Sequence, residues 1–475
     1  MREKDILSMF MNKAVVDILK TLTDEGFEVA IVGGAVRDIL TKKKVSDWDL
    51  TTSAKPEEIL KLFRNSFYNN RFGTVGVKAG KEIVEVTTYR REFKYSDSRH
   101  PDVVTWGETL EEDLARRDFT INAIALKIGS RVKGSGASLI DKKNYTPDAI
   151  PYPLILVDPF DGQTDLKAKI IRTVGNPDAR FSEDALRLIR AVRFATTLGF
   201  EIEKETKAAI VSNASLISKV SGERIRDELF KIIESENASG GILLLREVGL
   251  LAHILPELDV CFKVEQKSPK RHHIFDVGTH CVKSLEFCPS KKIVVRFATL
   301  LHDIGKAKVA EITAEGVRTF YNHEVAGGRQ VLSICKRLNF SRGDRERIYK
   351  LVRWHQFSVG ENQTDKALRR FIRNIGLENV QDMMDLRIGD RLGGGLQQPE
   401  SWRLKLYRQR LKEVLKKPFT VADLKVNGRD VMEILGISPG PRVGEVLNKL
   451  FGEVSDDNKK NRRGYLLERV KGLKS

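Results

Sequence analysis

The sequence predicts an α+β protein in which a mixed head of strands and helices is followed by an all-helical body. Up to about residue 126, short apolar runs that suit strands alternate with helical patterns. Beyond Asn176-Pro177 the patterns are helical almost to the last residue. The length of 475 residues fits about two to four domains. We expect a head over 1–172, a helical neck over 173–262, a body over 263–395 and a basic helical tail over 396–475.

The composition favours a polyanionic partner. There are 82 lysines and arginines against 65 aspartates and glutamates, a formal net charge of +17, which most simply indicates nucleic acid. With 41% hydrophobic residues, a mostly disordered chain is excluded. No apolar run is long enough for a membrane span, and no signal peptide is visible. Four cysteines without CxxC spacing argue against disulfides and a zinc ribbon, so we expect a cytoplasmic protein.

Within the head, apolar runs and turn residues divide the chain into short elements. Helical spacing of apolar residues predicts a helix over 5–26, and glycine and proline separate the segments that follow. We expect strands at 27–32, 46–50, 75–78 and 83–88, and short helices beginning at Ala35 and Pro56. The Gly- and Pro-rich stretch 129–153 predicts a long surface loop.

Two aspartates on one predicted strand form the first candidate site. Asp47 and Asp49 flank Trp48, and because side chains alternate along a strand, both carboxylates are expected on the same face. Carboxylate oxygens are ligands that Mg²⁺ prefers, and a pair of metal ions can stabilise the attacking and leaving oxygens of phosphoryl transfer. Glu85 on the strand 83–88 is either a third carboxylate near the metals or an exposed residue of the open face.

A glycine turn precedes these aspartates. Gly33-Gly34 ends a predicted strand and opens a helix, where backbone N–H groups can hold phosphates and glycine permits close approach. Arg37 would add positive charge on the same side, or would pair with Asp38. The turn supports a catalytic role for the paired aspartates.

Several segments resemble the motifs of one enzyme family. Residues 33–38 (GGAVRD), followed by 47–49 (DWD), resemble the signature of class II CCA-adding tRNA nucleotidyltransferases and bacterial poly(A) polymerases. Further segments follow in the order of that family: 116–123 is similar to its ribose-recognition motif, 158–162 to its hinge motif, 183–187 to its nucleotide-templating motif and 423–430 to the start of the bacterial tail domain. Five motifs in order make the resemblance specific.

The resemblance implies a polymerase-β-like head that adds C, C and A to the 3′ end of tRNA from CTP and ATP. Mg²⁺ would be held by Asp47 and Asp49, with Glu85 as a third catalytic carboxylate. The neck and tail would bind tRNA through its phosphates, in agreement with the positive charge. The nucleotide-binding residues that the resemblance implies are Gly33, Gly34, Arg37, Arg117, Asp118, Asn122, Asp184, Arg187, Arg190 and Arg193.

The templating segment suggests how a base is selected. Asp184 and Arg187 are three residues apart and would face the same way on one helix. A carboxylate accepts a hydrogen bond from the exocyclic amine of cytosine or adenine, and a guanidinium donates to ring or carbonyl acceptors. Arg190 and Arg193 continue the same face and suit contact with a triphosphate. An ordinary Asp–Arg helix pair is the alternative interpretation.

Two related activities stay open. Residues 95–107 are similar to the flexible loop that helps this family switch from CTP to ATP, although Ser98 stands where glycine is more common. The loop argues against addition of CC alone and leaves an enzyme that adds only A as one alternative. Bacterial poly(A) polymerase is the other, although residues 71–77 (RFGTVGV) resemble the CCA-adding pattern.

The body contains a second constellation. An adjacent His-Asp pair, with a histidine upstream and an aspartate downstream, resembles the HD phosphohydrolase superfamily. Imidazole and carboxylate ligands suit Mn²⁺, Fe, Ni²⁺ or Co²⁺, and such sites hydrolyse phosphoesters. The ligands that this resemblance implies are His280, His302, Asp303 and Asp390, with His323 and His355 as candidates for a binuclear site. An HD phosphohydrolase with an inactive head is the alternative from a different class.

Overall fold

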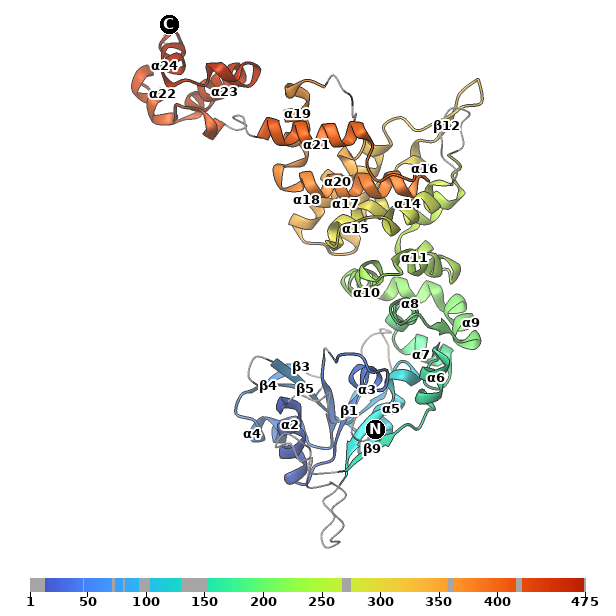
Figure 1. The fold of residues 1–475 in the computed structure, drawn as a ribbon. Helices are drawn as coiled ribbons and strands as arrows, with labels where there is room; N and C mark the ends of the chain where they lie inside the picture. The colour runs from blue at the N-terminus through green and yellow to red at the C-terminus, as the bar shows by residue number, and fades with distance from the viewer. Residues whose placement is uncertain are drawn as a thin grey trace. The chain divides into compact units, whose positions relative to one another are not determined.

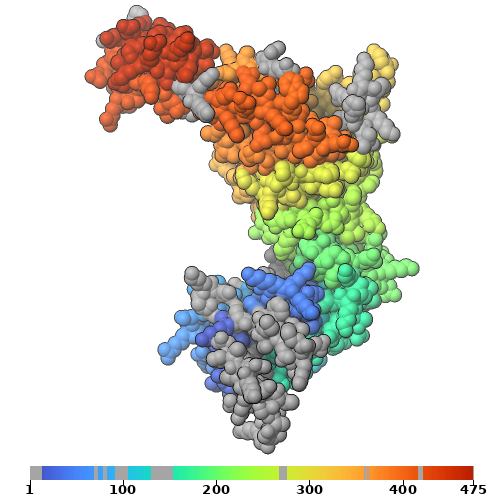
Figure 2. Space-filling view, viewed as in Figure 1, coloured from blue at the N-terminus to red at the C-terminus, as the bar shows by residue number. Residues whose placement is uncertain are grey.

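The computed structural model describes residues 13–45, 47–70, 73–79, 82–93, 103–129, 153–266, 275–357, 360, 363–415 and 421–473. The chain divides into two compact units, Met1–Pro256 and Glu257–Ser475. Figure 1 shows the elements of each unit as ribbons, and Figure 2 shows them in space-filling form, coloured from blue to red along the chain.

A seven-stranded sheet forms the head (Figure 1). Its order is β3-β4-β5-β2-β1-β8-β9, and all neighbours are antiparallel except β2 and β5, which are parallel. Strands β6 and β7 form a separate antiparallel hairpin. The strands are β1 (Val29–Val32), β2 (Asp49–Thr52), β3 (Ser66–Asn70), β4 (Thr74–Ala79), β5 (Glu82–Thr88), β6 (Arg90–Phe93), β7 (Val103–Trp106), β8 (Ala125–Ile128) and β9 (Leu154–Val157).

Both faces of the sheet are covered at β1, which explains why this strand is apolar throughout. Val29 and Ile31 belong to a core cluster that includes residues of α2, α3 and α4, whereas Ala30 and Val32 pack on the opposite side with Tyr89. Side chains alternate along a strand, so a strand buried on both faces reads as a continuous apolar run. The head helices are α2 (Lys13–Asp24), α3 (Gly34–Leu40), α4 (Pro56–Leu62), α5 (Leu110–Ala115) and the 3₁₀ turn η1 (Thr120–Asn122).

The strand that was expected to carry both aspartates begins later in the chain than predicted. It begins at Asp49, where pairing with Val32 of β1 starts, so Asp47 lies in the loop before it. The prediction that Asp47 and Asp49 lie on one strand is therefore wrong. Trp48 between them is buried in the core cluster, which anchors this loop against the head.

Other differences concern elements with weak local signals. Strands β3, β6, β7, β8 and β9 were not expected, because they are short and lack clear alternation. Residues 5–12 of the helix expected over 5–26 lie outside the described residues, as do 130–152 of the expected loop, 95–102 of the family loop and 71–72 of the RFGTVGV segment.

The rest of the first unit is mainly helical, and α8 packs against both α10 and α11. Two short parallel strands, β10 (Ile170–Ile171) and β11 (Glu201–Ile202), join the segments on either side of α7 and α8. The helices are α6 (Gly162–Ala168), α7 (Pro177–Glu183), α8 (Leu186–Leu198), α9 (Lys204–Asn213), η3 (Ala214–Lys219), α10 (Gly222–Glu234), α11 (Ala238–Glu247) and α12 (Leu251–Ile254), followed by α13 (Pro256–Asp259) at the boundary.

The second unit is helical except for the hairpin β12 (Glu311–Ile312) and β13 (Arg318–Thr319) in its described part. Helix α14 packs against α20, and α15 packs against α18. The helices are η4 (Val260–Lys263), α14 (Val277–Glu286), α15 (Ile293–Leu301), α16 (Lys306–Val309), α17 (His323–Arg337), α18 (Arg342–Trp354), α19 (Asp365–Ile375), η5 (Leu377–Asn379), α20 (Val380–Gly393) and α21 (Trp402–Leu415).

The tail helices surround a hydrophobic cluster of their own, which includes Val431, Leu450 and Leu466. They are η6 (Val421–Asp423), α22 (Gly428–Leu435), α23 (Pro441–Asp456), η7 (Asn458–Lys460) and α24 (Arg463–Lys471). Among the described residues, no helix combines the length and the apolar character that crossing a membrane requires.

Candidate functional site

Acidic side chains gather where β2 begins. Asp49 of β2 is in register with Glu85 of β5, and paired residues on neighbouring strands share a face. Burial raises the pKa of Asp49, and the nearby Asp47 raises it further, although Arg117 opposes both effects. Because burial and like charge disfavour ionisation, a divalent cation would stabilise this group of acids. The oxygen donors fit Mg²⁺, and Glu85, which is exposed, has the right register for a third carboxylate.

The glycine turn brings Arg117 to the same place. Gly33 has a φ of 70°, in the left-handed region that favours glycine. A Cβ at this position would lie 2.9 Å from Nη1 of Arg117 and 3.5 Å from Oδ2 of Asp49. Any side chain at residue 33 would displace Arg117, so glycine is needed for the backbone, the arginine and the aspartate to approach one another.

A polar network holds the ribose-recognition segment. Arg190 donates to Oδ2 of Asp118 at 2.8 and 2.5 Å, and the Asn122 amide donates to Oδ1 at 3.1 Å. Arg37 pairs with Asp38 and also donates to Oδ1 of Asn122 at 3.0 Å. Burial alone would raise the pKa of Asp118, but Arg190 and the hydrogen bonds lower it to about 2. The carboxylate is therefore ionised and oriented at neutral pH.

The templating segment does not form one helix. Asp184 ends α7 in an extended conformation, and its Oδ1 accepts from the backbone N–H of Leu186 at the start of α8. The prediction that Asp184 and Arg187 lie on a common helix is wrong, because Asp184 ends α7 and lies before α8, the helix that carries Arg187. Arg224 of α10 donates to Asp184 at 2.9 Å.

Arg187 is fixed from several sides. Its guanidinium donates to Glu183 at 2.7 Å and to the backbone carbonyls of Arg180 and Arg116 at 3.0 and 2.9 Å. These bonds leave Arg187 buried and rigid beside the ribose-recognition segment. A rigid guanidinium of this kind can present fixed donors to a base.

Two residues of α10 complete the network and were not foreseen. Glu228 is buried and accepts from Arg193 at 2.8 Å, and it lies 3.7 Å from Arg190. Arg224 holds Asp184 as described above. A signal was available for Glu228, because it lies between Ile225 and Leu229 on the buried face of the helix, where an unpaired charge is not tolerated.

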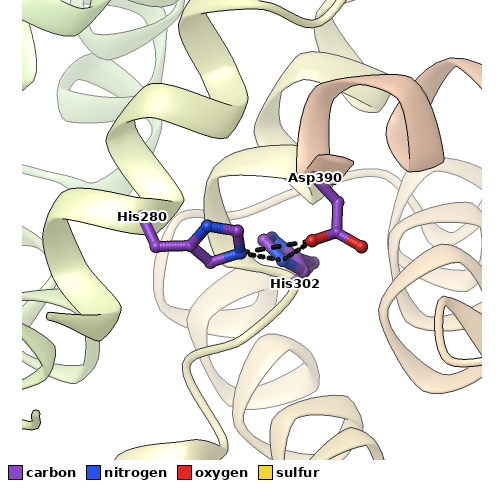
Figure 3. Close-up of side chains that lie close together, drawn as sticks. All are labelled: His280, His302 and Asp390. Atoms are coloured by element: carbon purple, nitrogen blue, oxygen red, sulfur yellow. Dashed lines mark hydrogen bonds and ion pairs between the residues drawn. The ribbon is translucent and has the colours of Figure 1, made fainter. Parts of the chain in front are cut away.

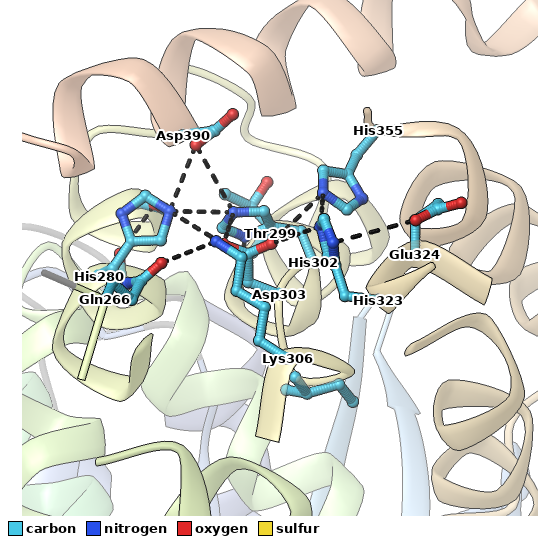
Figure 4. A network of polar contacts seen from close by, with 12 residues as sticks. Gln266, His280, Thr299, His302, Asp303, Lys306, His323, Glu324, His355 and Asp390 are labelled. Carbon is cyan, nitrogen blue, oxygen red and sulfur yellow. Dashed lines mark hydrogen bonds and ion pairs between the residues drawn. The ribbon is translucent and has the colours of Figure 1, made fainter. Parts of the chain in front are cut away.

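The body brings all six predicted metal ligands together. Two groups of three form, and in each group the ligand atoms lie within 4.8 Å of one another: His280, His302 and Asp390 (Figure 3), and Asp303, His323 and His355 (Figure 4). Asp303 touches both groups, since Oδ1 is 3.2 Å from His323 and 3.4 Å from His355, while Oδ2 is 3.4 Å from His280 and from His302. This arrangement fits a carboxylate that bridges two metal ions.

The imidazoles point their Nε2 atoms toward one another. Nε2 of His280 lies 3.2 Å from Nε2 of His302, and those of His323 and His355 are 3.3 Å apart. Nδ1 of His302, His323 and His355 lies 2.7–2.9 Å from the carbonyl oxygens of Thr299, Phe320 and Val352, respectively.

A carbonyl can only accept, so each of these rings carries its proton on Nδ1 when neutral and directs the Nε2 lone pair inward. Converging lone pairs repel, whereas a metal ion binds them all. The donor set of imidazoles and carboxylates fits Mn²⁺, Fe, Ni²⁺ or Co²⁺.

Electrostatics keep the carboxylate ligands ionised. Burial opposes ionisation of Asp303 and Asp390, but Lys306 and the histidines hold the pKa of Asp303 well below its usual range, and the hydrogen bonds from His280 and His302 do the same for Asp390. Burial lowers the pKa of His355, which favours the neutral ring that a metal requires, whereas Asp303 and Asp390 outweigh burial and raise the pKa of His280 and, to about 10, that of His302. Without a metal these two rings therefore also hold a proton on Nε2, which a metal ion would displace.

Three family models match parts of the chain. Residues 29–172 match the Poly A polymerase head domain, 199–262 the probable RNA and SrmB-binding site of polymerase A, and 271–387 the HD domain. The CCA-adding enzyme of Geobacillus sp. (strain WCH70) is 42% identical over 238 residues, a match that spans 50% of this chain and about half (53%) of that relative.

Other matches extend over nearly the whole chain. The CCA-adding enzyme of Ligilactobacillus salivarius (strain UCC118) is 31% identical over 463 residues, 97% of this chain and 96% of the relative. The crystal structure of the Bacillus stearothermophilus CCA-adding enzyme in complex with CTP is 26% identical, with a TM-score of 0.66 and coverage of 97% and 98% of the two chains. The chain belongs to the CCA-adding enzymes, a family of nucleotidyltransferases.

Proposed function

We propose that this chain adds C, C and A to the 3′ end of tRNA, using CTP and ATP as nucleotide donors and Mg²⁺ as the metal. The observation that carries the proposal is the register of Asp49 with Glu85, with Arg117 and the Gly33 turn against the same carboxylate. The relative of known structure was solved with CTP. The +17 charge supplies the attraction for tRNA phosphates. The four buried thiols are free, as expected of a cytoplasmic protein.

In the proposed phosphoryl transfer, different residues of the head bind the metal, the phosphates and the ribose. The 3′-hydroxyl of tRNA attacks the α-phosphorus of the nucleotide, and pyrophosphate leaves. Bound Mg²⁺ at Asp47 and Asp49 would lower the pKa of the hydroxyl and neutralise charge on the leaving group. Arg117, beside the glycine turn, is placed to contact the phosphates, and Asp118 with Asn122 is placed to hold the ribose hydroxyls.

Base selection would rest on Asp184 and the fixed guanidinium of Arg187. The carboxylate can accept from the exocyclic amine that cytosine and adenine share, while guanine and uracil present a carbonyl at that position. In this conformation Asp184 is bound to Arg224, so a bound base would share or replace that partner.

The test measures nucleotide incorporation into three tRNA transcripts. The first lacks CCA, the second ends in C and the third ends in CC. Each is given labelled CTP, ATP or both with Mg²⁺, beside an Asp47→Ala/Asp49→Ala control. We expect C-C-A on the first transcript and no incorporation by the control. A single A added only to the CC-ended tRNA would replace the proposal with an A-adding enzyme, and long A tails on unrelated RNA would replace it with a poly(A) polymerase.

A second activity is favoured by the six converging ligands of the body. We propose that this HD site is a binuclear metal centre that hydrolyses phosphoesters, independently of the head. The position of Asp303, with one carboxylate oxygen near each group of histidines, carries this proposal. Release of phosphate from a phosphomonoester would be measured with Mn²⁺, Co²⁺ or Ni²⁺. Asp303→Asn should abolish it, and activity that survives this substitution would contradict the assignment.

A further inference from the structure

The strands β3, β4 and β5 of the head sheet leave one of their two faces open. On the covered face the valines of β4 and β5 belong to the core cluster, and α4 packs against all three strands. On the other face the register sets Phe67 of β3, Gly76 of β4 and Glu85 of β5 in one row. Asp49 of β2 continues this row, so the open face adjoins the acidic site.

The open face combines apolar and basic side chains. Phe67 and Ile83 are 36% and 56% exposed, although both are large and hydrophobic. Lys78 pairs with Ile83 across the strands, is exposed, and has its Nζ 5.5 Å from the centre of the Phe67 ring. An aromatic ring on an open sheet surface, with a cation beside it, is typical of surfaces on which single-stranded RNA stacks its bases.

The glycine of β4 determines where the Phe67 ring lies. A Cβ at Gly76 would be 2.6 Å from Cζ of Phe67 and 3.0 Å from Cε1. Any other residue at position 76 would displace the ring, which lies over β4 and points from β3 toward β5. Since neighbouring strands are about 4.8 Å apart, the tip of the ring is roughly one strand spacing from the backbone of Glu85.

The other side of Asp49 is taken by the residues expected to hold the nucleotide. Gly33 follows β1, and the segment from Arg117 to Asn122 precedes β8. Both strands lie on the opposite side of β2 from β5. In phosphoryl transfer the attacking oxygen and the leaving group stand roughly in line, on opposite sides of the phosphorus. With the nucleotide on the side of β1, the attacking RNA end would therefore approach from the side of β5.

Resting on the proposed nucleotide addition, we propose that the open face of β3, β4 and β5 binds the 3′ end of the RNA that is extended. The terminal base would stack on Phe67, and Lys78 would pair with a backbone phosphate. The 3′-hydroxyl would then reach the carboxylates of Asp49 and Glu85. Stacking depends little on the identity of the base, so one surface would serve the different acceptor ends that successive additions create.

The first experiment measures incorporation of CTP by the full chain with Mg²⁺, at varied concentrations of a tRNA transcript that lacks CCA. Phe67→Leu keeps an apolar side chain but removes the ring, so kcat/KM for the RNA should fall about tenfold, as for the loss of one stacked base. Phe67→Tyr retains the ring and should keep most of the activity. Affinity for CTP alone, measured by equilibrium dialysis, should be unchanged in both variants.

The matched control is Tyr68→Leu. Tyr68 follows Phe67 in the same strand and is 45% exposed, but it belongs to the opposite face of the sheet. Its substitution should leave kcat/KM for the RNA unchanged. Lys78→Gln should lower the slope of log Kd against log salt for the RNA by about 0.7, the value for one phosphate of a single strand.

A second readout does not depend on activity. A tRNA transcript that ends in C carries 5-iodocytidine as its last residue and is irradiated in complex with the full chain, without CTP. This base forms a covalent link to an aromatic ring that it contacts. We expect the link at Phe67, in the tryptic peptide of residues 65–71, and its loss in Phe67→Leu but not in Tyr68→Leu.

The outcomes distinguish the RNA surface from the proposed function. An unchanged kcat/KM in Phe67→Leu, an equal loss in Tyr68→Leu, or the absence of a link at Phe67 would overturn the RNA surface while incorporation by the wild type stands. If the wild type incorporates no nucleotide, the proposed function fails and the crosslink alone decides. A link at Phe67 then supports the RNA surface, and a link elsewhere, or none, rejects it.

Discussion

The acidic site of the head and the HD site of the body are assembled in different ways. The head site lies at the start of a strand, with Glu85 exposed and Asp47 in a loop. The HD site is enclosed by helices, and backbone carbonyls orient three of its imidazoles (Figure 4). In the proposed activity the first would accept a nucleotide and an RNA end at every cycle, and an open site suits that role. The side chains of the second are already oriented without a ligand, which would suit the proposed metal centre.

The largest expected effect separates the two sites. Asp49→Asn should lower nucleotide incorporation by ~10³-fold or more, because it removes a carboxylate that would bind the metal, and metal stabilisation of the transition state is worth several kcal/mol. Phosphoester hydrolysis by the same variant should be unchanged. The measurement is initial rates of both reactions on one protein preparation. A parallel loss of hydrolysis would show that the two sites are not independent.

The converse substitution acts on the HD site. Asp303→Asn should reduce the bound Mn²⁺ from two ions toward none, since Asp303 reaches both ligand groups, while incorporation of CTP and ATP stays at the wild-type rate. Metal content after dialysis gives the stoichiometry. His253→Gln, which changes an exposed histidine of α12, is the matched control and should retain the metal. Retention of both ions by Asp303→Asn would contradict the bridging role.

A smaller effect concerns stability within the first unit. Glu228→Gln should lower the free energy of unfolding by about 3 kcal/mol, because the change leaves Arg193 with a neutral partner in a buried network, whereas Arg190 keeps Asp118. Urea denaturation followed by circular dichroism measures it. Glu223→Gln on the same helix is exposed and should change the stability by less than ~0.5 kcal/mol. Similar losses in the two variants would mean that the buried ion pairs contribute little.

The smallest effect is the dependence of stability on pH. The pKa of Asp118 is lowered from 3.8 to about 2 in the folded chain, so its contribution is fully present above pH ~4 and is lost as the pH falls toward 2. The full contribution is about 2 kcal/mol. The difference in unfolding free energy between the wild type and Asp118→Asn should therefore shrink between pH 5 and pH 3. A constant difference would indicate that the Arg190 pair does not shift this carboxylate.

The residue types of both candidate sites could be named from the sequence, but their contacts could not. The motif residues and the His-Asp quartet are local patterns of residue type, and each could be named without a structure. The assumption that local spacing sets geometry failed for Asp47 and Asp184. Asp47 lies before its strand and Asp184 ends its helix, because the burial of Trp48 and the hydrogen bond from Leu186 to Asp184 outweigh simple periodicity.

Residues that act through long-range pairing were hidden for the same reason. Glu228 and Arg224 belong to an ordinary amphipathic helix in the sequence, and they acquire a role only because α10 packs against α8. Arg391 likewise comes to line the cavity of the HD residues only through the packing of the body helices.

The sequence by itself determined the order of a mixed head and a helical body and the positive charge that suits RNA, and it predicted the residue types of both candidate sites. Only the tertiary structure decided the register that sets Asp49 beside Glu85, the ion pair that joins Arg190 to Asp118 across 72 residues, and the meeting of six ligands from distant helices. The physical reason is that residue type and periodicity are local properties, whereas register, burial and ion pairing depend on how distant segments pack together.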